Sequence, residues 1–193
     1  MLDLSRKRHI AALLASIFAT LGLAAPATAD SAVPASAPPP VTDLTAAEQQ
    51  ELQTQVANRL KDYGGGEQIS INQISYLNGT IILTLPLPGE ERARSINEPL
   101  AASAAPTCGY THACLWSDTN FNGAKIERVN CGVITLGAPF NSSTASVYNN
   151  QTPGTQTVLM NGSRQILNAS LAPSRINDTG VGSRFNARYW RVC

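Results

Sequence analysis

The stretch CGYTHACLWSDTNFNGA occupies residues 108–124 and opens the half of the chain in which short β-prone segments recur. Cys108 and Cys114 stand close enough to close a short loop. Trp116 follows, and Phe121 stands two residues before Gly123. A glycine there supplies a backbone conformation with positive φ, and an aromatic ring packs over the turn. The stretch therefore predicts a β-hairpin braced by a disulfide.

Short β-prone segments follow, separated by clusters of Gly, Asn, Ser and Thr, and no helical period is visible after residue 106. The candidate strands are residues 114–117, 124–130, 146–149, 156–160, 164–171 and 184–192. Regularly spaced short strands predict a mainly β fold, a sandwich or Greek-key arrangement. In the last strand, Trp190 shares one face with Arg184 and Arg188. That face would bind an anionic or glycan surface if it were exposed, and the alternative is that Trp190 belongs to the core.

All four cysteines of the chain lie in this half: Cys108, Cys114, Cys131 and Cys193. An even number of cysteines in an exported small domain predicts two disulfides, and four cysteines allow three pairings. We expect Cys108 to pair with Cys114, and Cys131 with Cys193. The competing interpretation, a tetrahedral metal site, lacks any C-x2-C spacing.

The beginning of the chain resembles a targeting segment. A basic cluster at residues 6–8 precedes an apolar run at residues 10–25, and Ala27 and Ala29 form an A-x-A cleavage pattern. This order predicts a secretory signal peptide at residues 1–29 and a secreted, extracellular protein. The apolar run is too short and too Ala-rich for a stable membrane anchor, so we expect no membrane association after cleavage.

Four further segments follow the signal peptide. Residues 30–43, rich in Pro and Ala, predict a disordered tether. Residues 44–89 predict a helix, started by a Thr45–Glu48 capping box, and a β-hairpin around the Asn78–Gly79 turn. Residues 90–105 predict a linker, and residues 106–193 a separate module.

Charge divides unevenly between these parts. Residues 30–105 carry nine acidic and four basic side chains, whereas residues 106–193 carry three acidic and seven basic ones. The two parts could therefore attract each other, or residues 44–89 could act as a pro-region that shields the module. A weakly basic module without a Lys/Arg run argues against nucleic-acid binding.

No catalytic constellation is visible, and we expect no enzymatic activity and no catalytic residue. After signal cleavage His112 is the only histidine, so neither a Ser/His/Asp triad nor an H-E-x-x-H zinc site has its usual partners. Asp118, Glu127 and Asp178 are the only carboxylates of the module, and their spacing supports no glycosidase pair.

Residues 108–124 resemble the start of the actinomycete metalloproteinase-inhibitor family, small secreted peptidase inhibitors with a βγ-crystallin-like Greek-key fold. The match rests on the C-x5-C spacing and the W-x6-G pattern of Trp116 and Gly123, with Phe121 beside them. Ser146 resembles the serine of the same motif, whose hydroxyl would tie the hairpin to a neighbouring strand. The resemblance covers residues 106–193 and implies a bacterial protein with such a fold.

The resemblance implies two activities. One is inhibition of an extracellular peptidase through an exposed loop, here Asn161, Gly162, Ser163, Arg164 and Gln165, which has no cysteine pair of its own. The other is weak calcium binding by oxygen ligands in two turns. The residues at those turns are Asn141, Ser146, Asn177, Asp178 and Ser183, and the alternative is that both turns are ordinary polar turns.

The sequence therefore predicts a secreted peptidase inhibitor that binds an extracellular peptidase through a loop. The alternative is a non-inhibitory structural module that binds the cell envelope or glycans, with or without calcium. No other cofactor is expected.

Overall fold

The computed structural model describes residues 44–96, 98 and 105–193, which lie within one compact unit, Ser36–Cys193. The expected signal peptide and the tether lie outside these residues, as does most of the second half of the expected linker. Within the described part, no helix is long and apolar enough to cross a membrane.

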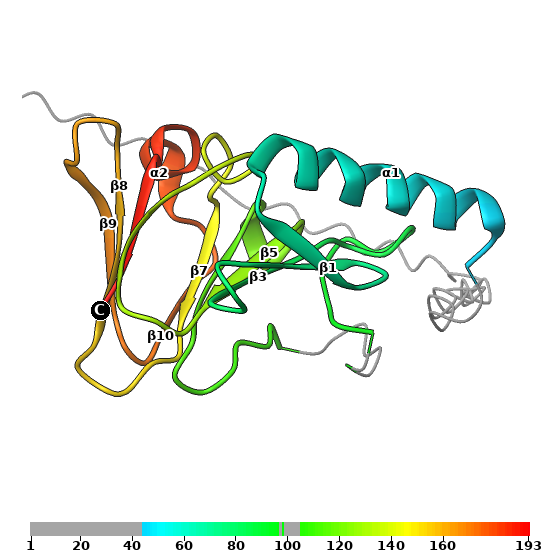
Figure 1. The fold of residues 1–193 in the computed structure, drawn as a ribbon. Helices are drawn as coiled ribbons and strands as arrows, with labels where there is room; N and C mark the ends of the chain where they lie inside the picture. The colour runs from blue at the N-terminus through cyan, green and yellow to red at the C-terminus, as the bar shows by residue number, and fades with distance from the viewer. Residues whose placement is uncertain (1–43, 97, 99–104) are drawn as a thin grey trace, which may run out of the picture. The chain divides into compact units, whose positions relative to one another are not determined.

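The fold is mainly β, as predicted, and the described residues form eleven strands in two antiparallel sheets (Figure 1). The larger sheet has the order β1-β2-β3-β5-β4-β7-β10. Its strands are β1 (Gly66–Ser70), β2 (Gln73–Tyr76), β3 (Ile81–Thr84), β5 (Lys125–Arg128), β4 (Ala113–Trp116), β7 (Ser146–Asn149) and β10 (Ser174–Ile176). The smaller sheet has the order β6-β11-β8-β9, with β6 (Gly132–Thr135), β11 (Tyr189–Val192), β8 (Gln156–Met160) and β9 (Ile166–Leu171).

Strands β4–β11 form two sequence halves that exchange one strand each. In the first half, β4, β5 and β7 lie in the larger sheet, whereas β6 lies in the smaller one. In the second half, β8, β9 and β11 lie in the smaller sheet, whereas β10 pairs with β7 in the larger one. This reciprocal exchange is consistent with the Greek-key arrangement implied by the resemblance.

Helix α1 (Ala46–Tyr63) begins and ends as its sequence predicts. Thr45 accepts from the backbone of Glu48, and the Glu48 carboxylate accepts from the Thr45 backbone at 2.8 Å. Gly64, with φ of 58°, follows the last helical residue. Leu52 and Val56 on the apolar stripe are fully buried, so the helix is held by one face.

The segment after α1 is a three-stranded meander, one strand more than the expected hairpin. The Asn78–Gly79 turn joins β2 to β3 with positive φ at both residues, and Thr80 donates to the carbonyl of Leu77. A second tight turn at Asn72 divides the preceding apolar run into β1 and β2. Its side-chain amide is fully buried and donates to the carbonyls of Leu85 and Arg94. The buried amide fixes a turn that hydrophobic period alone does not reveal.

The meander joins the larger sheet through β3, which pairs with β5 from Ile81↔Arg128 to Thr84↔Lys125. Leu83, Ile126, Leu115 and Trp190 belong to one core cluster that also contains Leu52 of α1. The described part of the expected linker also lies against the module, since Ala93 donates to the carbonyl of Gly123. Residues 44–96 are thus a structural part of the same core.

The last expected strand, residues 184–192, is wrong in its first half. Helix α2 (Gly180–Asn186) occupies that position, and only Tyr189–Val192 form β11. Two glycines hide this helix in the sequence, because glycine is a poor helix former. Trp190 is fully buried and its Nε1 donates to Thr157 Oγ1 at 2.6 Å, so this ring belongs to the core. Strands β6 and β10 were not predicted.

Candidate functional site

The loop between β8 and β9 is the exposed segment predicted to contact a peptidase. Gly162, Ser163, Arg164 and Gln165 are exposed, and Asn161 is half-buried at the base of the loop. The loop is closed by a backbone hydrogen bond from Asn161 to the carbonyl of Gln165, at 3.0 Å. It therefore projects as a short turn between two paired strands.

The side chain of Asn161 holds this loop from the inside. Its Oδ1 accepts from the backbone nitrogens of Ser163 and Gln165, each at 2.9 Å, and its Nδ2 donates to Gln165 Oε1 at 2.8 Å. Short asparagine side chains commonly fix turns by bonding to nearby backbone groups. The contacts constrain a loop that lacks a disulfide.

Arg164 occupies the left-handed region of the backbone, with φ of 62°. Its guanidinium lies 4.8 Å from the centre of the Tyr189 ring, on β11. This cation–π contact fixes the one charged side chain of the loop over the smaller sheet.

A second exposed loop, residues 109–112, is closed by the disulfide between Cys108 and Cys114. His112 donates to the carbonyl of Gly109, and Thr111 has φ of 71°, which is unusual for a β-branched residue. Tyr110 lies in this loop and is 68% exposed. Rings of this kind often anchor protein interfaces, and sequence reasoning did not single this one out.

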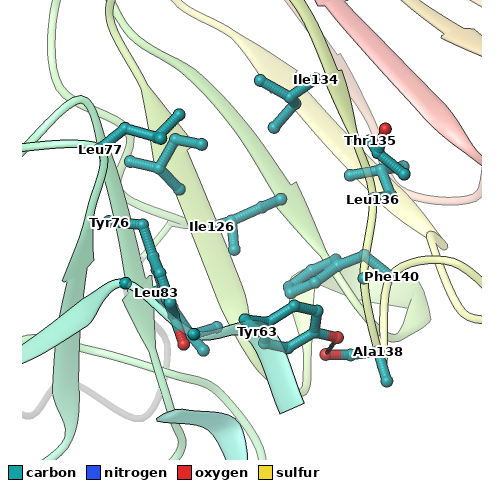
Figure 2. Close-up of a pocket in the computed structure, with 14 residues that line it drawn as sticks. Tyr63, Tyr76, Leu77, Leu83, Ile126, Ile134, Thr135, Leu136, Ala138 and Phe140 are labelled. Carbon is teal, nitrogen blue, oxygen red and sulfur yellow. Dashed lines mark hydrogen bonds between the residues drawn. The ribbon is translucent and has the colours of Figure 1, made fainter. Parts of the chain in front are cut away.

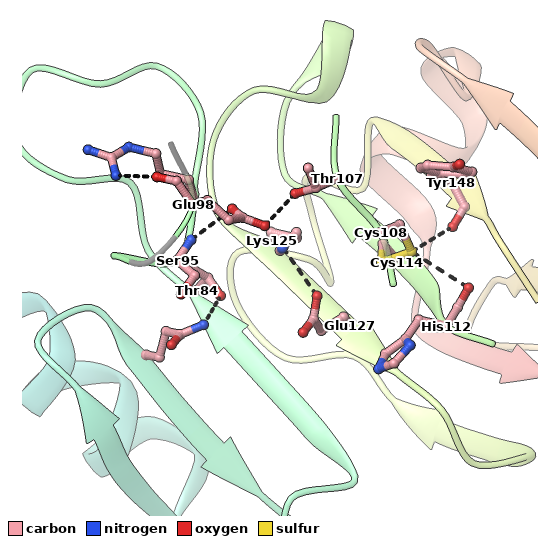
Figure 3. A network of polar contacts seen from close by, with 12 residues as sticks. Thr84, Ser95, Glu98, Thr107, Cys108, His112, Cys114, Lys125, Glu127 and Tyr148 are labelled. Atoms are coloured by element: carbon pink, nitrogen blue, oxygen red, sulfur yellow. Dashed lines mark hydrogen bonds and ion pairs between the residues drawn. A yellow bond between two sulfur atoms is a disulfide. The ribbon is translucent and has the colours of Figure 1, made fainter. Parts of the chain in front are cut away.

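Neighbouring backbone groups fix this second loop. Thr111 donates to the carbonyl of Asn150, and Asn150 donates back to the carbonyl of His112. The side chain of Asn150 also donates to the carbonyl of Cys108 at 2.8 Å. Figure 3 shows the disulfide with His112 and Tyr148 beside it. His112 Nδ1 lies 2.9 Å from the carbonyl of Tyr110, so the imidazole is occupied by its own loop.

The four predicted motif residues meet in one place. The rings of Trp116 and Phe121 contact edge to face, with 5.2 Å between centroids. Gly123 has φ of 75°, and a Cβ there would collide with Ser117 and Asp118. Ser146 is fully buried; its Oγ accepts from Phe121 N at 3.0 Å and lies 2.7 Å from the carbonyl oxygen of Asp118. The cluster supports the fold. Within the described residues, Trp116 Nε1 is buried without a hydrogen-bond partner.

The second disulfide joins Cys131 to Cys193, so both bonds have the expected pairing. It attaches the C-terminal residue beside β6.

Two of the five candidate calcium ligands, Ser146 and Asp178, use a side-chain oxygen in hydrogen bonds within the protein. The Asn141 carbonyl accepts from Arg188, and Asn177 Nδ2 contacts Asn120 at 3.4 Å. Ser183 is buried within α2. Asp178 accepts from Gly180 N at 2.8 Å and from Arg184 at 2.7 Å. The bond from the Gly180 backbone, which has the larger effect, and the bond from Arg184 both hold the pKa of Asp178 below its usual value.

No metal-binding group of three His, Cys, Asp or Glu residues occurs in the part of the chain that the structure describes. Among the module's carboxylates, Glu127 pairs with the buried Lys125 at 3.1 Å (Figure 3). Asp118 stands at the start of the Thr119–Phe121 turn. This arrangement indicates structural roles for both.

Residues 101–159 match the sequence model of peptidase inhibitor family I36. The match confirms the resemblance to a peptidase-inhibitor family, and that family consists of inhibitors and not of enzymes. No curated protein and no solved structure gives a significant match. The matched segment contains the Cys108–Cys114 loop and the motif cluster around Ser146, and it ends just before Asn161.

Proposed function

We propose that the chain is secreted and inhibits an extracellular peptidase by binding it through the Asn161–Gln165 loop. The family match supports a peptidase as the partner. Two disulfides support an oxidising, extracellular location, because such bonds persist there.

The observation that carries the loop proposal is the set of hydrogen bonds made by the Asn161 side chain. A loop that is already ordered loses less conformational entropy when it binds, so more of its interaction energy appears as affinity. Asn161 bonds to both Ser163 and Gln165, and so spans the exposed residues. In this chain an amide takes the place that a disulfide would have in a cysteine-bearing loop.

The same geometry favours inhibition over cleavage. Strands β8 and β9 flank the loop and are paired from Gln156↔Leu171 to Met160↔Ile166. A peptide bond cut within the loop would leave both new ends held in the sheet. The cut ends would stay close together, which favours resynthesis of the bond and slows release.

The proposal is tested by the residual activity of a thermolysin-like metallopeptidase and a subtilisin-like serine peptidase, titrated with the full chain lacking its signal peptide. We expect the activity of one of them to fall linearly and end at an equimolar amount. If both stay fully active while the chain remains folded and uncleaved, the proposal is wrong. Binding to the cell envelope would then become the leading alternative, although both tryptophans are buried and unavailable for glycan stacking.

A further inference from the structure

A pocket of about 340 Å³ lies where the α1–β3 segment (residues 46–84) meets the module (residues 106–193). It lies away from the Asn161–Gln165 loop. Figure 2 shows its two sides: Tyr76, Leu77 and Leu83 face Ile134, Leu136 and Phe140, with Ile126 between them. The volume is at the small end of the range for ligand pockets, roughly 300–1,000 Å³.

The inner wall of this pocket is apolar. Leu83, Leu136 and Phe140 are each 3% exposed and Ile126 is 7% exposed, whereas Leu77 at the rim is 60% exposed. Among the residues that the structure describes, no charged side chain lines the pocket. The hydroxyl of Tyr63 donates to the carbonyl of Ala138, and that of Tyr76 to the carbonyl of Arg59. Because both hydroxyl protons are used, the interior suits a hydrocarbon or aromatic body.

Glycines keep the pocket open at the side of α1. Gly64 and Gly65 form part of its rim without side chains. A Cβ at Gly137 would collide with the ring of Tyr63, so this ring can stand at the rim only because residue 137 is a glycine. The Tyr63 and Tyr76 rings meet edge to face at 6.0 Å, which fixes one aromatic wall.

A cation stands beside the rim. Arg59 Nη1 lies 3.4 Å from the Ala138 carbonyl oxygen that also accepts from Tyr63. Among residues 44–96, 98 and 105–193, no carboxylate pairs with Arg59. Asp62 is also near, but Arg59 acts on the pKa of Tyr63 more strongly than Asp62 does. Arg59 therefore places a positive charge beside this rim.

We propose that this pocket binds a small apolar carboxylate, such as a medium-chain fatty acid, with its carbon chain inside and its carboxylate beside Arg59. The apolar walls select the carbon chain, and the Arg59 guanidinium selects the negative charge. The proposal is independent of inhibition, because the loop residues take no part in the pocket.

The test uses the full chain lacking its signal peptide, with hexanoate, octanoate and decanoate measured by calorimetry below their micelle concentrations. We expect one site per chain and an affinity that rises about fourfold per added methylene until the pocket is full, since each buried methylene contributes about 0.8 kcal/mol. Decanol should bind several-fold more weakly than decanoate. Arg59→Gln should remove that difference and leave decanol affinity unchanged.

Two variants fill the pocket: Ile81→Phe and Ile134→Phe, both at lining positions. We expect each to lower decanoate affinity at least tenfold, with near-UV circular dichroism unchanged. The matched control is Ile166→Phe on β9, which is 63% exposed and outside the pocket; it should bind like the wild type.

The proposal is overturned if the wild type shows no saturable binding, or if affinity does not depend on chain length. It is also overturned if folded filled variants bind as well as the control. If the filled variants do not fold, Arg59→Gln provides the test. The proposed role of Arg59 is overturned if this variant prefers decanoate over decanol as strongly as the wild type does.

Discussion

The side-chain oxygen of Asn161 accepts a hydrogen bond from the backbone nitrogen of Gln165, 2.9 Å away and across the tip of the β8–β9 loop. One asparagine thus orders five residues that would otherwise be a flexible connection. A loop that is already ordered loses less conformational entropy when it binds a peptidase cleft, so its affinity is higher. The proposed inhibitory loop is therefore ordered without a cysteine pair of its own.

The two disulfides should contribute unequally to stability. The Cys131–Cys193 bond spans 62 residues of chain and the Cys108–Cys114 bond spans 6. Loop-closure entropy then predicts that replacing Cys131 and Cys193 with Ala lowers the free energy of unfolding by about 4 kcal/mol, against about 2 kcal/mol for Cys108 and Cys114. Urea denaturation measures both. The reverse order would show that strain or residual structure dominates, and not the loop length.

The α1–β3 segment should unfold together with the module. Leu83 on β3 is 3% exposed in the shared core, so Leu83→Ala should lower the free energy of unfolding by about 2–5 kcal/mol. Fluorescence of Trp116 and Trp190, both in the module, should report this loss in a single transition. Ile69→Ala is the control, because Ile69 is 51% exposed. An unchanged tryptophan transition in Leu83→Ala would show that the segment folds separately.

We expect calcium to leave the thermal unfolding of the wild type unchanged. Asp178 is the single carboxylate at the two candidate turns, and it is paired with Arg184 at 2.7 Å. Calcium sites need several free oxygen ligands, and the Ser146 hydroxyl is used inside the fold. Differential scanning calorimetry with and without millimolar calcium measures the shift. A rise in melting temperature that disappears in Asp178→Asn would contradict this expectation.

Alkaline stability should depend on Tyr63. Burial, the largest cause, raises the pKa of its hydroxyl from 10.0 to about 12. The folded state therefore binds this proton more tightly than the unfolded state. Its contribution is fully present below pH 10 and is lost as the pH rises from 10 to about 12. Tyr63→Phe should flatten the fall in stability across that range, measured by urea denaturation at several pH values. If the free energy of unfolding falls equally steeply in the variant, another group causes the alkaline loss of stability.

Local signals in the sequence identify the elements whose ends are set by nearby residues. The Thr45–Glu48 capping box and the Asn78–Gly79 turn lie where they were expected, because each depends on contacts within a few residues. The Cys108–Cys114 pairing and the strands β7 and β8 are of the same kind. Cys131 and Cys193 are 62 positions apart, and their pairing is the one that remains once Cys108 is paired with Cys114.

Longer-range contacts account for what the sequence did not reveal. The pairing of β3 with β5 joins residues more than forty positions apart, and no pattern within either strand specifies its partner. The exposed Tyr110 was missed because its exposure depends on the Asn150 contacts that orient its loop. The apolar pocket likewise depends on Gly137, whose missing side chain matters only once Tyr63 lies against it.

Inhibition constants of two single variants show whether the Asn161–Gln165 loop contacts the peptidase, as we propose. Asn161→Ala removes the side chain that orders this loop, and Tyr110→Ala removes the exposed ring of the Cys108–Cys114 loop. Against whichever of the two peptidases the wild type inhibits, we predict that Asn161→Ala raises the inhibition constant at least about tenfold. Tyr110→Ala should stay near the wild type. A large loss with Tyr110→Ala and none with Asn161→Ala would contradict the account and place the contact at the Cys108–Cys114 loop.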